Sequence, residues 1–308
     1  MLPSCRRGWD RDLEVMRSVV GNGMRRRLLF GFALWLIVGQ GEAFAYVTDG
    51  DAYAPPSYLS FLPPDSGGSY RDATFGTSVK RISEALNQPN GADRDNLPFI
   101  INEYSTMSSF NAANSKLLLI HQSYLALYDG GGTFIRDSPL EIHALSESRW
   151  SRRDPSVLYY IKGNALKQYN IATDLMAVVR VFTEYTKISG FGESDISLDG
   201  NHFVLVGDNR YIFVYEISTD TKGSMLDTAG VGGFDQVLIT PSNSVLVGWY
   251  GIGSDRYQGV ELYDRDLKYL RQVSRAIGHM GVAQDLNGDE ILLVANAADP
   301  LPSVRTVS

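Results

Sequence analysis

The sequence predicts an all-β protein, a β-propeller of four-stranded blades with about four complete blades and a partial fifth. The first observation is a set of five apolar runs, spaced 40, 46, 42 and 46 residues apart, which begin at Lys116, Ser156, His202, Ser244 and Glu290. The second is that each of the first four runs is followed by a strand with a tyrosine, namely Tyr128, Tyr169, Tyr215 and Tyr263. A repeat of about 40–45 residues with four strands is typical of a propeller blade. The spacing alone also fits a β-sandwich, and the repeated tyrosine favours the propeller.

The composition agrees with a globular chain of many short strands. The 308 residues are 44% hydrophobic and 20% charged, and 30 glycines and 17 tyrosines favour strands joined by tight turns. The single cysteine, Cys5, excludes an internal disulfide and a cysteine-rich zinc site.

Residues 24–45 have the three parts of a secretory signal peptide. Three arginines at 25–27 are followed by an apolar run at 28–39, and Ala43 and Ala45 form a small-residue cleavage site before Tyr46. The apolar run is shorter than the roughly 20 residues of a membrane-spanning helix, so we expect cleavage rather than retention as an anchor. A signal peptide normally begins at the translated start, so we expect residues 1–23 to be a non-native N-terminal extension.

Cleavage would leave a more acidic chain. The whole sequence has 28 Lys and Arg against 35 Asp and Glu, a net charge of −7, and the first 45 residues hold seven arginines and four acids. The remaining residues therefore have 21 basic against 31 acidic side chains, a net charge of −10, and no cysteine. This charge disfavours nucleic acid or an anionic membrane surface as a partner. The expected location is the periplasm or the extracellular space, with no stable membrane span after cleavage.

Residues 46–72 are expected to be an extended linker, and residues 73–308 the incomplete propeller. The linker contains Pro55-Pro56, Pro63-Pro64 and a Gly-Gly pair, with little regular apolar spacing. Within the propeller, three of the apolar runs are preceded by a pair of residues that suits a hairpin turn, namely Asp154-Pro155, Asp199-Gly200 and Asn287-Gly288.

The fifth repeat is expected to be incomplete. Its first two strands are predicted, and the residues 299–303 then end the pattern without the expected tyrosine strand. An unclosed ring leaves strand edges that pair with other chains, so this ending predicts a C-terminally truncated product of a longer gene. Alternatively, residues 75–82 would supply an outer strand to the last blade.

Two stretches of the repeat resemble a known group of propellers. Residues 196–200 (ISLDG) precede the strands FVLVG and IFVYEI, and Trp150-Ser151 and Asp154-Pro155 precede VLYYI. These motifs resemble the WD40-like propellers of the TolB type, a bacterial group that includes oligogalacturonate-lyase-like proteins, over residues 74–297. The resemblance implies the fold rather than the function, because the motifs consist of turn and packing residues. In lyase-like members, polar groups at the channel hold a metal and an acidic sugar, and the match here assigns no catalytic residue.

Three polar residues of the predicted inner strands are candidate ligand-binding residues, namely Arg149, Asp195 and His279. Arg149 and Asp195 each adjoin a large apolar residue, and alternation along a strand would turn the charged neighbour toward the channel or its mouth. His279 precedes the innermost strand of the fifth repeat. The alternative for Arg149 and Asp195 is an inter-blade salt bridge, and the alternative for His279 is a structural or merely exposed role.

Common catalytic and metal-binding motifs are absent from the sequence. It contains no HExxH, GxSxG or GxxxxGK[ST] pattern. Asp285, Asn287 and Asp289 resemble the start of a calcium loop, but Glu290 and Asn296 occupy the positions of the required glycine and glutamate. We therefore expect a hairpin turn there, no metal site and no cofactor.

These observations predict an exported propeller that acts as a ligand- or partner-binding scaffold, with a carbohydrate or a protein as the partner. The basic cluster of Arg149, Arg152 and Arg153 would suit a carboxylated ligand, or it is a solvated turn. The alternative function, which rests on the family resemblance, is a polysaccharide lyase or hydrolase that acts on acidic sugars.

Overall fold

The computed structural model divides the chain into two units, Met1–Gly50 and Asp51–Ser308. All described residues belong to the second unit, and they are 53, 59–85, 97–104, 106–122, 124–190, 194–251, 255–296 and 299–307. The expected extension at 1–23, the signal peptide at 24–45 and most of the linker before residue 59 lie outside the described residues. Within the described ranges, no helix is long and apolar enough to cross a bilayer.

Four antiparallel sheets have four strands each, and in every sheet the strands are hydrogen-bonded in chain order. The strands of these four blades are β3 (Ile100–Ile101), β4 (Lys116–His121), β5 (Tyr124–Asp129) and β6 (Phe134–Asp137); β7 (Arg149–Trp150), β8 (Val157–Lys162), β9 (Ala165–Asn170) and β10 (Leu175–Val181); β11 (Ile188–Ser189), β12 (His202–Gly207), β13 (Tyr211–Glu216) and β14 (Thr221–Asp227); β15 (Phe234–Ile239), β16 (Val245–Tyr250), β17 (Gln258–Tyr263) and β18 (Tyr269–Ser274).

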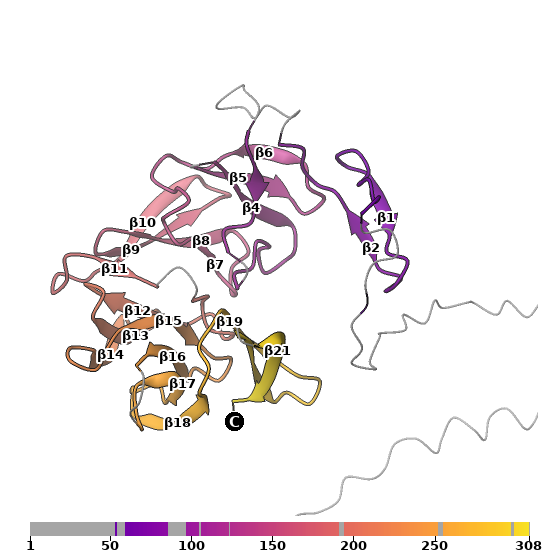
Figure 1. Ribbon diagram of the computed structural model, residues 1–308. Coiled ribbons are helices and arrows are strands. Elements are labelled where there is room, and N and C mark those ends of the chain that lie inside the picture. Colours follow the sequence, from indigo (N-terminus) through magenta and orange to yellow (C-terminus); the bar gives the residue numbers. More distant parts are fainter. Residues whose placement is uncertain are drawn as a thin grey trace, which may run out of the picture. The chain divides into compact units, whose positions relative to one another are not determined.

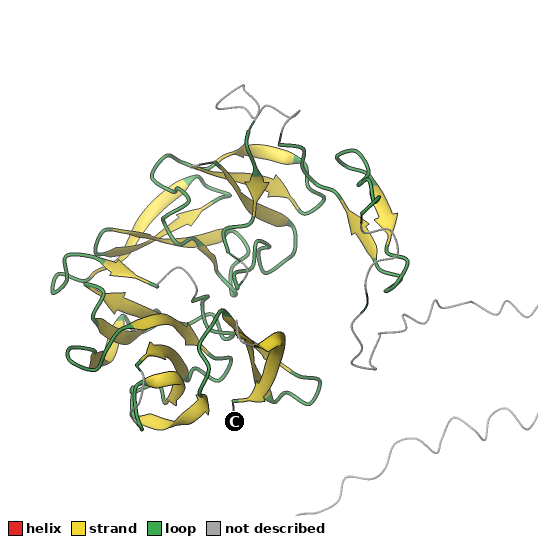
Figure 2. Cartoon of the chain, viewed as in Figure 1, coloured by secondary structure: helices red, strands yellow, loops and turns green. Residues whose placement is uncertain are grey.

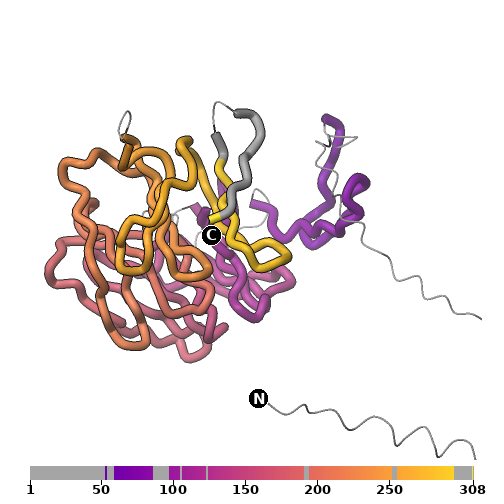
Figure 3. The backbone as a smooth tube through the Cα atoms, turned by 90° about the horizontal axis from the view of Figure 1, so that it is seen from below, coloured from indigo at the N-terminus to yellow at the C-terminus, as the bar shows by residue number. Residues whose placement is uncertain are grey.

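These blades follow one another around a common centre as a β-propeller, which confirms the predicted fold class (Figure 1). The described residues form strands, turns and loops without a helix, as Figure 2 shows. The chain completes each sheet before it enters the next, so the colours in Figure 3 change sheet by sheet along the sequence. Because neighbouring strands run in opposite directions, the turns between the first and second strands of all blades lie on one face, here called the turn face.

The last sheet has three strands, one more than the sequence predicts. It consists of β19 (Met280–Gln284), β20 (Glu290–Asn296) and β21 (Asp299–Thr306), in that order. The partial fifth blade is thus confirmed, but residues 299–306 add a third strand that was not predicted, since Ser303 pairs with Val294 and Thr306 with Ile291. Pro300 and Pro302 argue against a central strand, but β21 is at the edge of its sheet, where a missing N–H is tolerated.

Residues 75–82 do not complete the last blade. In the described structure, β2 (Ser78–Lys80) pairs with β1 (Ser69–Arg71) as a separate two-stranded hairpin. The hairpin lies against the first blade, because Lys80 Nζ donates a hydrogen bond to the carbonyl of Gly131 at 2.6 Å. Ile82 packs on the buried side chains Leu117 and Leu119, so this segment covers the free face of the first blade.

Each pair of neighbouring blades has its own apolar core. Buried side chains of the first two blades form one cluster, and the second and third, third and fourth, and fourth and fifth sheets form three more. The large aromatic residues Trp249, Tyr160 and Tyr215 are fully buried in these interfaces. A blade therefore buries its faces against its neighbours, as the periodic apolar runs require.

Two of the four repeated tyrosines, Tyr169 and Tyr215, connect neighbouring blades. The Tyr169 hydroxyl donates a hydrogen bond to Asp174 of the same blade. Arg136, on β6 of the preceding blade, donates to the same carboxylate at 2.8 Å and lies over the tyrosine ring. The second and third blades repeat this arrangement with Arg180, Tyr215 and Asp220.

Candidate functional site

The first candidate, Arg149, lies on β7 and joins three blades. Its side chain is 3% exposed, and its Nε donates a hydrogen bond to the carbonyl of Ser194 at 2.7 Å. Nη1 donates to the carbonyl of Ser148 at 2.8 Å and to Glu103 Oε1 at 3.4 Å. Glu103 follows β3 of the first blade, and Ser194 follows β11 of the third. Of the two interpretations of Arg149 from the sequence, this geometry corresponds to the inter-blade ion pair.

Glu103 is a functional candidate that sequence analysis missed. It lies in an irregular segment between β3 and the first turn, so no strand periodicity marks it. Burial raises the pKa of Glu103 to about 7, the guanidinium of Arg149 lowers it, and the nearby charge of Glu147 raises it. Sequence analysis could have found Glu103 as a charged residue beside an aromatic one, Tyr104, next to the inner strand of the first repeat.

His279 joins the last sheet to the first blade. It is exposed and directly precedes β19, as the sequence predicts. Its Nδ1 is 2.7 Å from the hydroxyl of Tyr104, the residue after Glu103. The structure therefore links Arg149 and His279 to adjacent residues of one segment, although the two candidates come from different blades.

Asp195 lies beyond the end of β11 and pairs with an arginine of the second blade. Its Oδ2 accepts a hydrogen bond from Arg152 Nη2 at 2.8 Å, and Arg152 Nε donates to the carbonyl of Ile196 at 3.3 Å. The two side chains remain partly accessible, with 20% of Asp195 and 37% of Arg152 exposed. This is also an inter-blade ion pair. It is partly open to solvent, whereas the pair of Arg149 and Glu103 is largely buried.

Two cavities meet at this ion pair, and both are lined by Arg152, Asp195 and Leu198. The first has a volume of about 200 Å³, and most of its other lining residues come from the fourth and fifth sheets: Leu238, Ile239, Pro241, Gly281, Val282, Ala283 and Gln284. The second has a volume of about 320 Å³ and lies toward the first blade, between Phe110, Asn111 and Trp150. We call the region of these two cavities the channel mouth.

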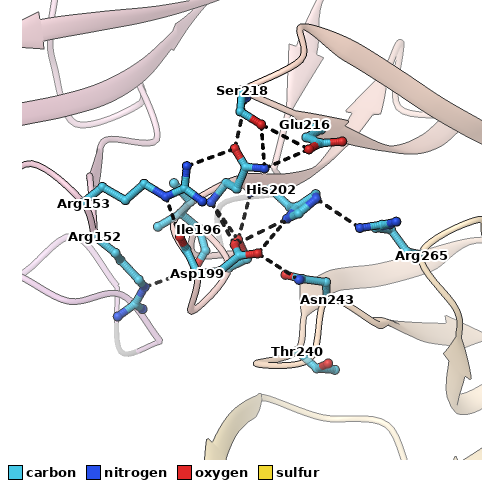
Figure 4. Close-up of polar contacts among 12 residues, drawn as sticks. Arg152, Arg153, Ile196, Asp199, His202, Glu216, Ser218, Thr240, Asn243 and Arg265 are labelled. Carbon is cyan, nitrogen blue, oxygen red and sulfur yellow. Dashed lines mark hydrogen bonds and ion pairs between the residues drawn. The ribbon is translucent and has the colours of Figure 1, made fainter.

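A polar network beside the channel mouth surrounds Asp199 (Figure 4). Burial alone would raise the pKa of Asp199. Hydrogen bonds from the Ser197 hydroxyl, the backbone N–H of Asn201 and the Asn243 side chain outweigh this effect and lower the pKa to about 2. Arg153 of the second blade donates to the Asp199 carbonyl at 2.7 Å, and Asn243 of the fourth blade donates to Oδ2 at 3.0 Å. The turn of the third blade is therefore held from both sides.

His202 takes part in the same network. Its Nδ1 is 3.3 Å from Asp199 Oδ2, and its Nε2 is 3.4 Å from Arg265 Nη1. A guanidinium nitrogen only donates, so Nε2 accepts this hydrogen bond and Nδ1 carries the ring proton toward Asp199. The imidazole is buried in this arrangement, and Figure 4 shows it between the two partners.

Metal-ligating groups do not gather in the part of the chain that the structure describes. No group of three His, Cys, Asp or Glu side chains in that part has a geometry suited to a metal ion. The four histidines have separate surroundings, since His121 pairs with Tyr128 and His143 bonds within its own loop.

Comparisons with known proteins concern the fold. No protein-family model and no curated protein sequence matches the chain. A solved structure of an oligogalacturonate lyase in complex with manganese is 14% identical with a TM-score of 0.46, and the match covers 78% of this chain and 72% of that one. An oligogalacturonate lyase from Vibrio parahaemolyticus is 12% identical with a TM-score of 0.48, over 77% of this chain and 71% of that one. The β-propeller fold of this chain rests on its own sheet order and on the cores between its blades.

Proposed function

We propose that this protein is an exported propeller that binds a ligand or partner at the channel mouth. The observation that carries the proposal is the meeting of two cavities at the Arg152–Asp195 pair. A concave site on which a few polar groups converge is a usual form of a ligand site. Volumes of about 200 and 320 Å³ fall at or below the lower end of the range for drug-sized ligands, so the bound group is small.

The surroundings of the channel mouth support a binding surface. Phe110 and Leu198 are exposed on the turn face, and Leu286 is exposed in the corresponding turn of the last sheet. Apolar side chains that stand at the rim of a cavity favour contact with a partner. Export is supported by the signal-peptide pattern at 24–45, with the periplasm or the extracellular space as the destination.

The export part of the proposal is tested on protein from the native host. Intact mass and N-terminal sequencing should show a chain that begins at Tyr46 and is recovered outside the cytoplasm. Secreted protein that still carries residues 1–23 would contradict it.

The binding part is tested with a photoreactive residue placed in the exported protein. We expect a residue at position 198 to form a defined adduct, measured by intact mass, in living cells. The matched control is position 145, because Leu145 is also exposed but lies in the β6–β7 connection, on the face opposite the turn face. Equal labelling at both positions, or none at 198, would refute binding at the channel mouth.

The alternative, a lyase or hydrolase of acidic sugars, gives a different result in a separate assay. Purified residues 46–308 are incubated with oligogalacturonate, and the products are followed by ultraviolet absorbance and by mass. A binding protein leaves the oligosaccharide intact. Shortened or unsaturated products that appear at a rate proportional to the protein concentration would favour the enzyme.

A further inference from the structure

The walls of the channel mouth define the chemistry of its ligand. The inference below rests on the proposed function, since it names what the channel mouth binds. On one side, Arg152 and Asp195 present a positive and a negative group that face the same two cavities. On the other side, the accessible side chains of Leu198, Pro241 and Val282 form an apolar wall of the cavity of about 200 Å³.

The charged pair is able to receive a ligand. Within the described residues, Arg152 uses Nε and Nη2 for hydrogen bonds, and Nη1 makes none. Asp195 accepts from its neighbour's amide through Oδ1 and from Arg152 through Oδ2, and a carboxylate has about four acceptor positions. A partly exposed ion pair contributes little to stability, so opening it toward ligand charges costs little.

The ligand that complements both charges is a zwitterion. A ligand with a carboxylate alone would be attracted by Arg152 but repelled by Asp195. A ligand with an ammonium group alone would be attracted by Asp195 but repelled by Arg152. An adjacent carboxylate and ammonium satisfy both residues together, and an attached aliphatic group fills the apolar wall.

We propose that the channel mouth binds a free aliphatic α-amino acid. The α-carboxylate bonds to Arg152, the α-ammonium group bonds to Asp195, and the side chain lies against Leu198, Pro241 and Val282. The first cavity is too small for most of a drug-sized molecule, which agrees with a ligand of this size.

The experiment is calorimetric titration of residues 46–308 with leucine and with two analogues that each lack one charge. N-acetyl-leucine lacks the ammonium group, and leucinamide lacks the carboxylate. We expect leucine to bind and each analogue to bind at least 10-fold more weakly. No heat with leucine up to its solubility limit, or equal binding of all three compounds, would overturn the proposal.

Variants of the two charged residues assign each contact. Asp195→Asn should remove the preference for leucine over N-acetyl-leucine, and Arg152→Gln should remove the preference for leucine over leucinamide. Arg153→Gln is the matched control, because Arg153 is an exposed neighbour that lines neither cavity. Thermal melting that matches the wild type shows that the variants are folded. Unchanged preferences in the folded variants would refute the assignment.

Failure of this inference is distinct from failure of the proposed function. If leucine does not bind but the photoreactive residue at 198 still gives its adduct, the amino-acid assignment is wrong and the binding role stands. If both results are negative, the channel mouth is not a binding site.

Discussion

The outer faces of the first and last sheets of the propeller differ in how far their apolar side chains are buried. The first blade buries Leu117, Leu119 and Tyr128 on its free face, where Ile82 of the N-terminal segment covers them. The corresponding face of the last sheet leaves Leu293 exposed. A terminal repeat needs a covered or polar outer face, so the residues that follow the β1–β2 hairpin act as a cap for the first blade.

The largest loss of stability should come from substitution of Arg149, which connects the first blade to the second and third. We expect Arg149→Met to reduce the free energy of unfolding by about 3–5 kcal/mol, because it leaves Glu103 and two carbonyls buried without their donor. Denaturant unfolding at pH 8 provides the measurement, and Arg152→Met, at an exposed pair, should lose no more than about 1 kcal/mol. Equal losses in the two variants would show that Arg149 is not a buried tie.

The second largest effect should come from the ionisation of Glu103, the buried partner of Arg149. Its pKa of about 7 in the folded state lies well above 4.5, the ordinary value for a glutamate. The protonated form is therefore favoured by folding, and this contribution is fully present below about pH 4.5 and lost as the pH rises through 7. We expect Glu103→Gln to be more stable than the wild type at pH 8, by on the order of 3 kcal/mol, with a much smaller difference at pH 5.

The control for this pH dependence is Glu184→Gln, because the hydrogen bond from Lys222 lowers the pKa of Glu184. A carboxylate with a lowered pKa stays ionised from pH 5 to 8, so its substitution should change both values alike. A Glu103→Gln variant whose stability follows the wild type at both pH values would contradict the prediction.

The cap itself is tested by one charge on each end sheet. We expect Ile82→Asp to cost about 2–3 kcal/mol, because it uncovers the apolar face of the first blade and places a carboxylate against it. Leu293→Asp adds the same charge to a face that is already exposed, and it should change the stability by no more than about 0.5 kcal/mol. Thermal and denaturant unfolding would measure both, and similar losses would show that the two ends do not differ.

The smallest effect should come from the hydrogen bond between the two end sheets. Tyr104→Phe removes the hydroxyl that lies 2.7 Å from His279 Nδ1 and keeps the ring. We expect a loss of about 0.5–1.5 kcal/mol, the usual contribution of one hydrogen bond. Tyr250→Phe is the control, because its hydroxyl bonds to Asp235 within the fourth sheet and should leave the contact between the end sheets unchanged.

The repeat itself could be predicted from the sequence, because packing between blades demands the same residue types at the same spacing. The partners of the repeated tyrosines could not be predicted as easily, because Arg136 and Asp174 come from different blades. A search for basic and acidic residues separated by one repeat length would have found this pair. The strand β21 was missed because its prolines are permitted only by its edge position.

The sequence named three candidate residues without their surroundings. The sequence placed Arg149, Asp195 and His279 at inner strands. In the structure Arg149 lies on β7, whereas Asp195 lies beyond the end of β11 and His279 directly precedes β19. The sequence did not show that Arg149 is buried or that Asp195 lies beside two cavities. Strand alternation does not specify how far a side chain is from solvent. Arg152 was noticed as part of a basic cluster, but its ion pair with Asp195 depends on the turn of the next blade.

The separate apolar cores between neighbouring blades imply that this protein does not unfold from its middle. When each repeat contacts only its neighbours, stability is a sum of nearest-neighbour terms, and the repeat with one interface opens at the lowest free energy. Among the described residues, the last sheet shares an apolar core with the fourth blade alone, whereas β12 lies between two packed neighbours. Backbone amides of β20 should therefore exchange with solvent deuterium before those of β12, and the order of exchange along the chain would record the order of the blades.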